Sequence, residues 1–270
     1  MSRHRIPKEQ LQDLLVRRGL AETRAQAERI ILAGQVWVNG EKLTQAGAPC
    51  ASDVAVELRG GRPYVSRGGL KLEGALKDFS FAVSGQNCID VGASSGGFTD
   101  CLLKAGAQSV TAVDVGYGQF DWGLRQCSSV TLFERTHIAR VAPELLGAPF
   151  DLLVADLSFT SLARLAPELA ALLREQGSAI TLVKPQFELP KAAVKHGVVR
   201  SFDLHVQALE SVLQAYQNTG LVPQRQSFSR FPGPKGNIEF WIWAVKQGAR
   251  ATIDVEETVR RAHEELSVSQ

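Results

Sequence analysis

The sequence predicts an α/β protein: a doubly wound, mostly parallel sheet closed by an antiparallel hairpin, preceded by a small α+β unit. From residue 66 onward, short apolar runs alternate with amphipathic helical patterns, which is typical of a parallel sheet covered on both faces. A Pro/Gly-rich loop, not a helix, separates the last two apolar runs, which predicts the hairpin. The first sixty residues instead show two helical patterns followed by short alternating segments.

In the front unit, residues 10–18 place their leucines on one helical stripe, and Gly19 follows as an expected C-cap. Thr23 is a good N-cap for a second helix that extends up to Gly34, with Ala27, Ile30, Ile31 and Leu32 expected on its buried face. Asn39-Gly40 lies between two alternating segments and is a strong hairpin signal. We expect a further strand at residues 54–58 and then a linker.

The elements expected in the main unit follow from the same two periodicities. The expected strands are residues 88–91, 110–114, 130–133, 152–155, 179–183, 224–230 and 238–245. The expected helices are residues 98–104, 118–126, 161–174, 203–217 and 253–266. The predicted division of the chain is a front domain at 1–58, a linker at 59–65, the sheet domain at 66–247 and a C-terminal helical segment at 248–270.

Charge is distributed unevenly along the chain, although 30 Lys and Arg nearly balance 28 Asp and Glu. Residues 1–77 hold 13 Lys and Arg against 8 Asp and Glu, so the front of the chain is basic and the remainder slightly acidic. A basic front predicts an anionic partner. No apolar run approaches the roughly 18 residues of a membrane span, and the start lacks a signal-peptide apolar region. The four cysteines are widely spaced, and we therefore expect a cytoplasmic protein that uses no membrane anchor, no disulfide and no metal.

A glycine-rich turn follows the first strand of the sheet and predicts a nucleotide site at the carboxyl ends of the strands. Ser94 replaces the second glycine of the dinucleotide fingerprint, which argues against NAD. Asp114 ends the next strand and is placed to bind ribose hydroxyls. A nucleoside cofactor without a pyrophosphate, S-adenosylmethionine, accounts for both features. The candidate cofactor-binding residues are Asp90, Gly92, Ala93, Ser94, Gly96, Gly97, Phe98 and Asp114.

The same turn also satisfies Gly-x-Ser-x-Gly, the nucleophile elbow of serine hydrolases. Such an enzyme would need a histidine, for which His196, His205 and His263 are available. This alternative leaves the acid at the end of the second strand unexplained.

Four charged residues stand in apolar or glycine-rich settings: Lys71, Asp156, Lys184 and Glu239. Each alone has a structural explanation, but two lysines and two carboxylates in one pocket would match a chemical need. A ribose 2′-hydroxyl is a weak nucleophile, so attack on a sulfonium methyl group needs a base or a cation beside the oxygen. Lys184 is the expected central residue, oriented by Asp156 and Glu239, with Lys71 adding positive potential. Phe159 is equally compatible with stacking on an extruded base and with an ordinary core position.

Five segments of the chain, residues 66–72, 90–100, 114–118, 182–188 and 236–239, together resemble the TlyA family. These proteins are ribosomal RNA 2′-O-methyltransferases, also called hemolysin A, with a Rossmann-like, FtsJ-like catalytic domain behind an S4 RNA-binding domain. The resemblance implies S-adenosylmethionine as cofactor and 16S and/or 23S ribosomal RNA, in a ribosomal subunit, as partner. It also implies a Lys-Asp-Lys-Glu tetrad, which falls on Lys71, Asp156, Lys184 and Glu239.

The chain departs from the family pattern in two places. Gln10 and Gln12 stand where the S4 pattern usually opens with Arg-Leu-Asp, and His137 stands where Asn is common, near the expected adenine. The remaining candidate phosphate contacts are Arg3, Arg5, Arg18, Arg24 and Lys42. Two further hypotheses remain open at this point: a non-catalytic RNA-binding or assembly protein, and a membrane-active protein of the kind that the older family name suggests.

Overall fold

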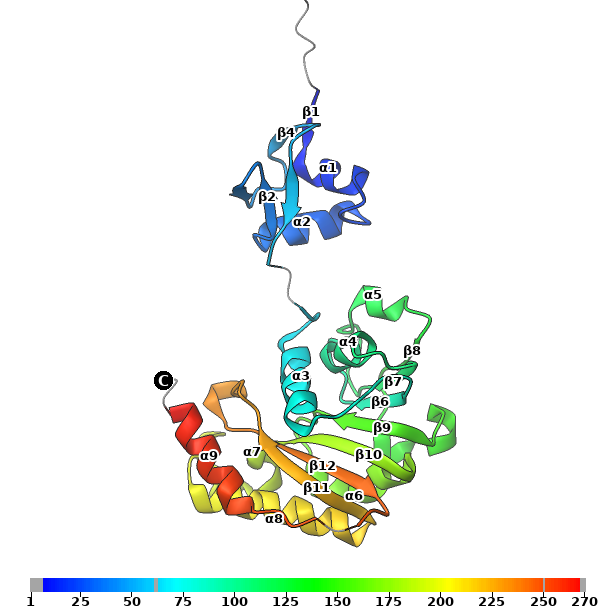
Figure 1. Ribbon diagram of the computed structural model, residues 1–270, viewed down its shortest axis with the longest axis vertical. Coiled ribbons are helices and arrows are strands. Elements are labelled where there is room, and N and C mark those ends of the chain that lie inside the picture. The colour runs from blue at the N-terminus through cyan, green and yellow to red at the C-terminus, as the bar shows by residue number, and fades with distance from the viewer. Residues whose placement is uncertain (1–6, 61–62, 250, 268–270) are drawn as a thin grey trace, which may run out of the picture. The chain divides into compact units, whose positions relative to one another are not determined.

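The structure is a computed structural model that describes residues 7–60, 63–249 and 251–267 (Figure 1). Contacts between Cα atoms divide the chain into two compact units, Met1–Pro63 and Tyr64–Gln270. Each unit has its own hydrophobic core, and the predicted contacts Arg3 and Arg5 lie outside the described residues.

The first unit contains helices α1 (Leu11–Arg17) and α2 (Arg24–Leu32) and two small sheets. Strand β2 (Val36–Val38) pairs with β3 (Glu41–Leu43) and β5 (Val56–Leu58), which confirms the hairpin at Asn39-Gly40. The expected strand at residues 54–58 is shorter than predicted. Strands β1 (Lys8–Gln10) and β4 (Pro49–Ala51) pair with each other and were missed, because three residues are too few to show alternation.

The caps of this unit follow the sequence, but one core prediction is wrong. The Thr23 side chain accepts a hydrogen bond from the Gln26 amide, as expected of an N-cap. Leu32 is 64% exposed, whereas Ile31 is fully buried. Consecutive helical residues point about 100° apart, so Leu32 turns toward solvent when Ile31 faces the core.

The second unit is built on a seven-stranded sheet in the order β11-β12-β10-β9-β6-β7-β8. Its strands are β6 (Asn87–Val91), β7 (Ser109–Val113), β8 (Val130–Phe133), β9 (Phe150–Ala155), β10 (Leu173–Val183), β11 (Leu221–Phe228) and β12 (Phe240–Lys246). Strands β6 to β10 run parallel, and β12 and β11 add an antiparallel hairpin beside β10. This arrangement confirms the predicted fold class.

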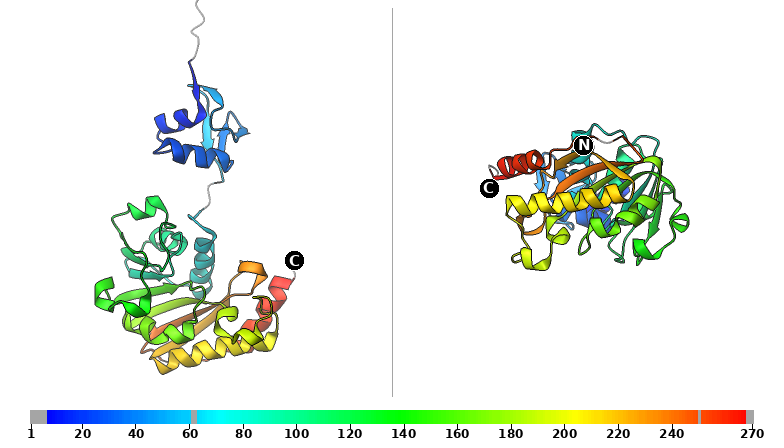
Figure 2. Two further views of the ribbon diagram at one scale, coloured as in Figure 1. Left: turned by 180° about the vertical axis from the view of Figure 1, so that it is seen from behind. Right: turned by 90° about the horizontal axis from the view of Figure 1, so that it is seen from below.

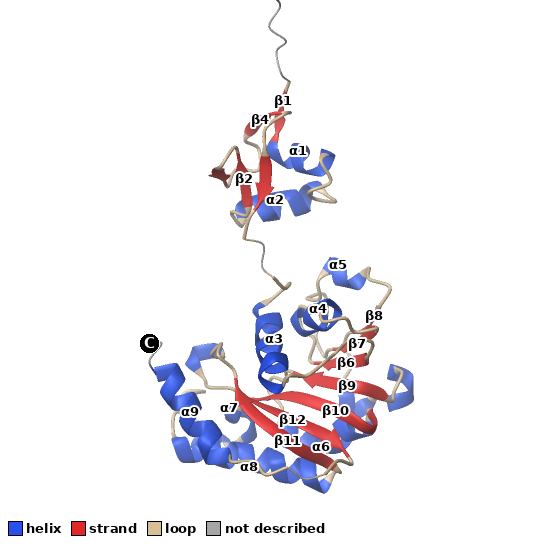
Figure 3. Ribbon diagram, in the orientation of Figure 1, coloured by secondary structure: helices blue, strands red, loops and turns tan. Residues whose placement is uncertain are grey.

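Helices cover both faces of this sheet (Figures 1–3). The helices are α3 (Arg67–Phe79), α4 (Gly97–Lys104), α5 (Trp122–Arg125), α6 (Leu162–Ala171), α7 (Pro185–Glu188), α8 (Phe202–Asn218) and α9 (Val255–Ser267). Alternate residues of β9 enter opposite cores: Leu152 and Val154 pack with α3 and α4, while Leu153 and Ala155 pack with α6, α8 and α9. Side chains alternate across a strand, so both faces must be covered. No helix in the described part of the chain is long and apolar enough to cross a membrane.

Several predicted elements need correction. The helix expected at 161–174 ends at Ala171, β10 begins at Leu173, β11 spans Leu221–Phe228, and helix α3 was not among the expected elements. The helix expected at 118–126 is confined to α5, because Gly118 has a left-handed φ of 74° and Asp121 caps the shorter helix instead. Glu239 was placed within a strand, but it lies immediately before β12, in the loop that borders the site. Asp156 and Lys184 follow the last residues of adjacent parallel strands, as expected, at the same edge of the sheet as the turn after β6.

Candidate active site

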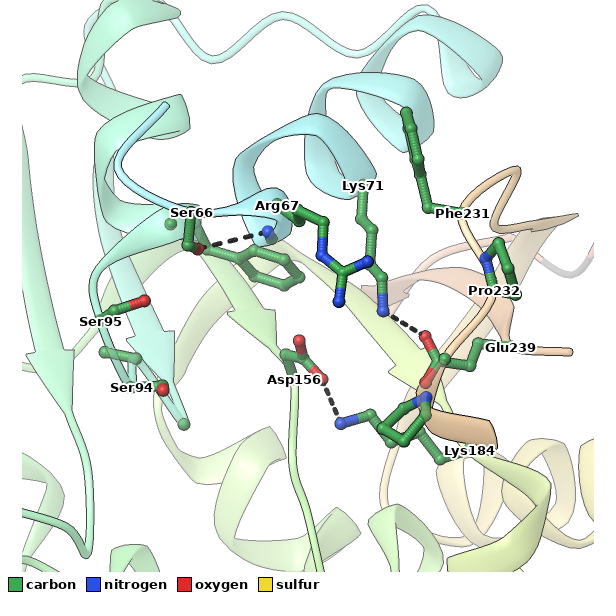
Figure 4. Close-up of a pocket in the computed structure, with 17 residues that line it drawn as sticks. Ser66, Arg67, Lys71, Ser94, Ser95, Asp156, Lys184, Phe231, Pro232 and Glu239 are labelled. Carbon is green, nitrogen blue, oxygen red and sulfur yellow. Dashed lines mark hydrogen bonds and ion pairs between the residues drawn. The ribbon is translucent and has the colours of Figure 1, made fainter. Parts of the chain in front are cut away.

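A cavity of about 310 Å³ lies at this edge, between the start of α3, the turn after β6, the ends of β9 and β10, and the loop before β12 (Figure 4). All four residues of the expected tetrad line it: Lys71, Asp156, Lys184 and Glu239. They come from four separate segments, and Lys71 and Glu239 are 168 positions apart in sequence.

The four side chains form two ion pairs. Lys184 Nζ lies 2.6 Å from Asp156 Oδ1 and donates a hydrogen bond of 3.0 Å to Ser158 Oγ. Lys71 Nζ lies 2.6 Å from Glu239 Oε2. Glu239 was expected to orient Lys184, and the structure instead bonds it to Lys71. Asp156 and Ser158 are therefore the residues that orient the Lys184 ammonium.

Burial strengthens the dependence of each charge on its ion-pair partner. Lys184 is 7% exposed and Glu239 is fully buried. Burial raises the pKa of the Glu239 carboxyl, while the Lys71 ammonium opposes that shift. A buried charge persists only when it is paired, so each lysine depends on its carboxylate. The lysines can hold a developing negative charge in the cavity without a metal ion.

A second cavity of about 550 Å³ adjoins the first and shares Gly92, Ser94 and Asp156 with it. Asp114 fixes two of its walls: Oδ2 accepts from the Ser94 amide at 2.7 Å, and Oδ1 accepts from the Gly116 amide at 2.6 Å. A carboxylate oxygen has more than one lone pair, so Asp114 can still accept from ribose hydroxyls.

Gly92 lies where the two cavities meet and lines both of them. Its φ is +88°, and a Cβ there would lie 2.7 Å from the carbonyl oxygen of Asp156. Only glycine allows this approach. The small residues of the turn and the Asp114 carboxylate, which line the larger cavity, are groups that fit a nucleoside.

The remaining predicted cofactor contacts divide into two groups. Ala93, Gly97 and Phe98 line the smaller cavity. Asp90 and Gly96 line neither cavity. Asp90 is fully buried, and its Oδ2 accepts a hydrogen bond of 2.7 Å from Thr99 Oγ1. Asp90 therefore connects the end of β6 to α4, because Thr99 belongs to the helix that follows the turn.

Burial raises the pKa of Asp90 from 3.8 to about 7, against the opposing effect of the Thr99 hydrogen bond. The folded protein then holds a proton that the unfolded chain releases near pH 4. We expect this carboxyl to lower the free energy of unfolding by roughly 1 kcal/mol per pH unit as the pH rises from about 4 to about 7. Asp90→Asn should lack this component. Urea titrations of both proteins from pH 4.5 to 7.5 measure it, and a pH-independent difference between them would contradict the assignment.

One residue at the site, Arg67, escaped the sequence analysis. Arg67 lines the smaller cavity, and its side chain points into it beside Lys71 (Figure 4). Its spacing of four residues from Lys71 on a helix was the available signal. His137, which the sequence analysis placed near the expected adenine, lines the larger cavity, and its Nδ1 accepts a hydrogen bond from the Ala139 amide at 3.2 Å.

The geometry gives no support to the serine hydrolase alternative. His205 and His263 bond to each other through Nδ1 and Nε2 at 2.8 Å, and His196 lies in an exposed loop after α7. Within the described residues, no hydrogen bond joins Ser94 to a histidine. No group of three or more potential metal ligands occurs in the described ranges either.

The candidate phosphate contacts of the first unit differ in what they already bind. The Arg18 guanidinium donates to the carbonyl oxygens of Ser52 and Val54 and is occupied within the unit. Arg24 pairs with Asp13 and donates to the Gln10 side chain. Lys42 is exposed and has no ion pair within residues 7–60.

The sheet, the glycine-rich turn and the acid after the second strand define a methyltransferase of the Rossmann-like class. Residues 64–246 match the family model of FtsJ-like methyltransferases, and residues 10–53 match that of the S4 domain. The chain is 42% identical over 253 residues to the 16S/23S rRNA (cytidine-2′-O)-methyltransferase TlyA of Mycobacterium tuberculosis, covering 92% of this chain and 94% of the relative.

Two further relatives carry the hemolysin name. Hemolysin A of Brachyspira hyodysenteriae is 37% identical over 224 residues, covering 82% of this chain and 93% of the relative. A structure described as a hemolysin of Streptococcus thermophilus superposes with a TM-score of 0.74 at 37% identity, covering 98% of this chain and 99% of that one. The chain belongs to the TlyA family, in which an S4 domain precedes an FtsJ-like methyltransferase domain.

Proposed function

We propose that this enzyme transfers the methyl group of S-adenosylmethionine to a ribose 2′-hydroxyl of ribosomal RNA, in 16S and/or 23S RNA within a ribosomal subunit. The observation that carries the proposal is two ion pairs, Lys184–Asp156 and Lys71–Glu239, each with one buried member, in a cavity that adjoins a nucleoside-sized one. The relative from Mycobacterium tuberculosis, described as an rRNA cytidine-2′-O-methyltransferase, supports the substrate class. Such a substrate would place the enzyme in the cytoplasm.

When bound, S-adenosylmethionine supplies an electrophilic methyl group on a sulfonium. Asp114 and the turn at residues 92–97 would hold its nucleoside and tail. Lys184 Nζ, held by Asp156 and Ser158, would donate a hydrogen bond to the 2′-oxygen and stabilise the negative charge that develops there. The oxygen would bond to the methyl carbon as the carbon–sulfur bond breaks, which leaves the cofactor as a neutral thioether, and the hydroxyl proton would pass to solvent. Lys71, paired with Glu239, adds positive potential on the opposite side of the cavity.

Phe159 supports an RNA substrate whose target nucleotide is turned out of its stack. It lines the larger cavity but is 92% exposed, and its ring centroid lies 5.3 Å from that of Phe187. Its left-handed φ of 62° is uncommon for an aromatic residue. An aromatic ring presented in this way can stack on an extruded base.

The S4 domain is proposed to dock the RNA by phosphate contacts. Lys42 and Arg24 are exposed on it, and Arg3 and Arg5 belong to the same proposal. Contacts of this kind position the RNA without reading its sequence.

Transfer of labelled methyl groups tests the function. Purified protein is incubated with labelled S-adenosylmethionine and ribosomal subunits from a strain that lacks it, and the RNA is digested to nucleosides. We expect label in a 2′-O-methylated nucleoside. Cofactor and RNA binding without transfer would refute the enzyme in favour of an assembly factor. Leakage from protein-free lipid vesicles, without transfer, would instead favour the membrane-active alternative.

A further inference from the structure

Two loops on the methyltransferase unit, residues 189–200 and 229–238, are joined by one buried side chain. We call them the loop pair. Asn237 is 2% exposed, and its Oδ1 accepts from the Val199 amide at 3.0 Å. Its Nδ2 donates to the carbonyl oxygens of Gly197 and Pro234 at 3.0 and 3.1 Å. One amide thus satisfies groups in both loops, and breaking it would leave buried polar groups unpaired.

The loop pair is continuous with the catalytic cavity. Residues 231–234 form one wall of that cavity (Figure 4). The Gly233 amide donates to the Asn237 carbonyl at 2.9 Å, and the Ser229 amide donates to the Glu239 carbonyl at 2.8 Å. On the other side, Leu189 and Val199 pack against Ala208 of α8. Asn237 therefore connects a firmly anchored outer loop to the segment that carries Glu239.

Positive charge is concentrated on these loops. Together they contain five Lys and Arg and no Asp or Glu, whereas residues 64–270 hold 20 Lys and Arg against 21 Asp and Glu. Lys191, Lys195 and Arg200 are exposed, and none of the three has an ion-pair partner in the part of the chain that the structure describes. Lys235 Nζ donates to the His196 carbonyl at 3.1 Å. The fifth cation, Arg230, pairs with Asp78 at 2.9 Å. A nearly neutral unit thus presents three exposed cations without an ion-pair partner on the loop that Asn237 joins to the cavity wall.

We propose that the loop pair is a second RNA-docking surface, which binds phosphates of the strand whose ribose enters the cavity, and that Asn237 is the positioning residue that holds it in place. This inference rests on the proposed function. Lysine and arginine side chains that meet phosphates supply affinity that depends steeply on salt. A surface next to Glu239 also limits which nucleotide of a bound strand can reach Lys184.

A triple variant, Lys191→Gln, Lys195→Gln and Arg200→Gln, tests the surface. Each lost contact with a single strand lowers the slope of log K against log salt by about 0.7, so we expect the slope to become shallower by about 2. KM for the RNA should rise about tenfold or more, while kcat stays within about twofold and cofactor affinity is unchanged.

A control triple removes the same charge elsewhere on the unit. Lys77→Gln, Arg174→Gln and Arg260→Gln alter side chains that are 72%, 58% and 54% exposed on α3, β10 and α9. Its salt slope and KM should equal those of the wild type. Equal slopes for the two triples, with a wild type that methylates RNA, would overturn the docking surface and leave the function intact. A wild type that transfers no methyl group would refute the function itself.

Asn237→Ala tests the positioning role without changing the charge. We expect it to raise KM for the RNA severalfold and to leave cofactor affinity unchanged, with a folded protein confirmed by its circular dichroism. A wild-type KM would overturn the role of Asn237.

Loss of binding to phosphatidylglycerol vesicles in the loop-pair triple, with wild-type RNA binding, would identify a lipid surface as the partner and overturn the RNA proposal.

Discussion

Lys184→Ala is expected to lower kcat for methyl transfer by about 10² to 10⁴-fold, the range typical of a group that assists proton loss from the reacting oxygen. The Lys184 ammonium is held by Asp156 and Ser158 at the end of β10, so its charge is oriented before substrate binds. Alanine leaves no donor at that position. Because Lys184 does not line the larger cavity, the dissociation constant of the cofactor should change much less than kcat.

Stability must be measured together with this activity. Removing Lys184 leaves the Asp156 carboxylate without its ion-pair partner, and such losses cost about 3 to 5 kcal/mol when the pair is buried. Asp156 retains 23% side-chain exposure, so we expect a smaller cost here, and urea unfolding measures it. Lys77→Ala, on the exposed side of α3, is the control and should keep wild-type kcat. Transfer by Lys184→Ala at the wild-type rate would contradict the assignment of Lys184.

Gly92→Ala is expected to weaken cofactor binding by at least about tenfold. A non-glycine residue at this left-handed φ costs about 1 to 2 kcal/mol by itself. The added Cβ would also lie 2.7 Å from the Asp156 carbonyl oxygen, which is backbone and cannot swing away. The turn and the end of β9 must then move apart, and both border the shared part of the two cavities.

Gly118→Ala is the control that separates the effect of backbone strain from that of the steric contact with Asp156. Gly118 also has a left-handed φ, of +74°, but a Cβ there would meet no atom within 4 Å. This control should lose stability but keep cofactor affinity. Isothermal titration of both variants with S-adenosylmethionine makes the comparison. Equal affinities in the two variants would show that the contact between Gly92 and Asp156 does not shape the cofactor site.

Sequence patterns predicted most of the sheet, because buried parallel strands are continuous apolar runs and hairpins carry specific turn residues. They failed where elements are very short, as at β1 and β4, and where a single residue decides which way a helix faces, as at Leu32. Arg67 was missed because a first-turn arginine looks like an ordinary solvated charge until the helix is placed against a cavity.

By itself, the sequence determined the fold class, the family and the four charged residues of the cavity. Strand-end positions in a parallel sheet converge on one edge, which accounts for Asp156 and Lys184. Lys71 and Glu239 were found as charged residues in glycine-rich or apolar settings and by the family resemblance. Only the tertiary structure showed which lysine pairs with which carboxylate. Glu239 bonds to Lys71, although the pairing of β12 with β10, with Val183 opposite Phe240, brings Glu239 close to Lys184 as well. The hydrogen bonds of Asn237 to the two loops also depend on tertiary packing. Hydrogen bonds between segments far apart in sequence follow from packing geometry, which no local pattern records.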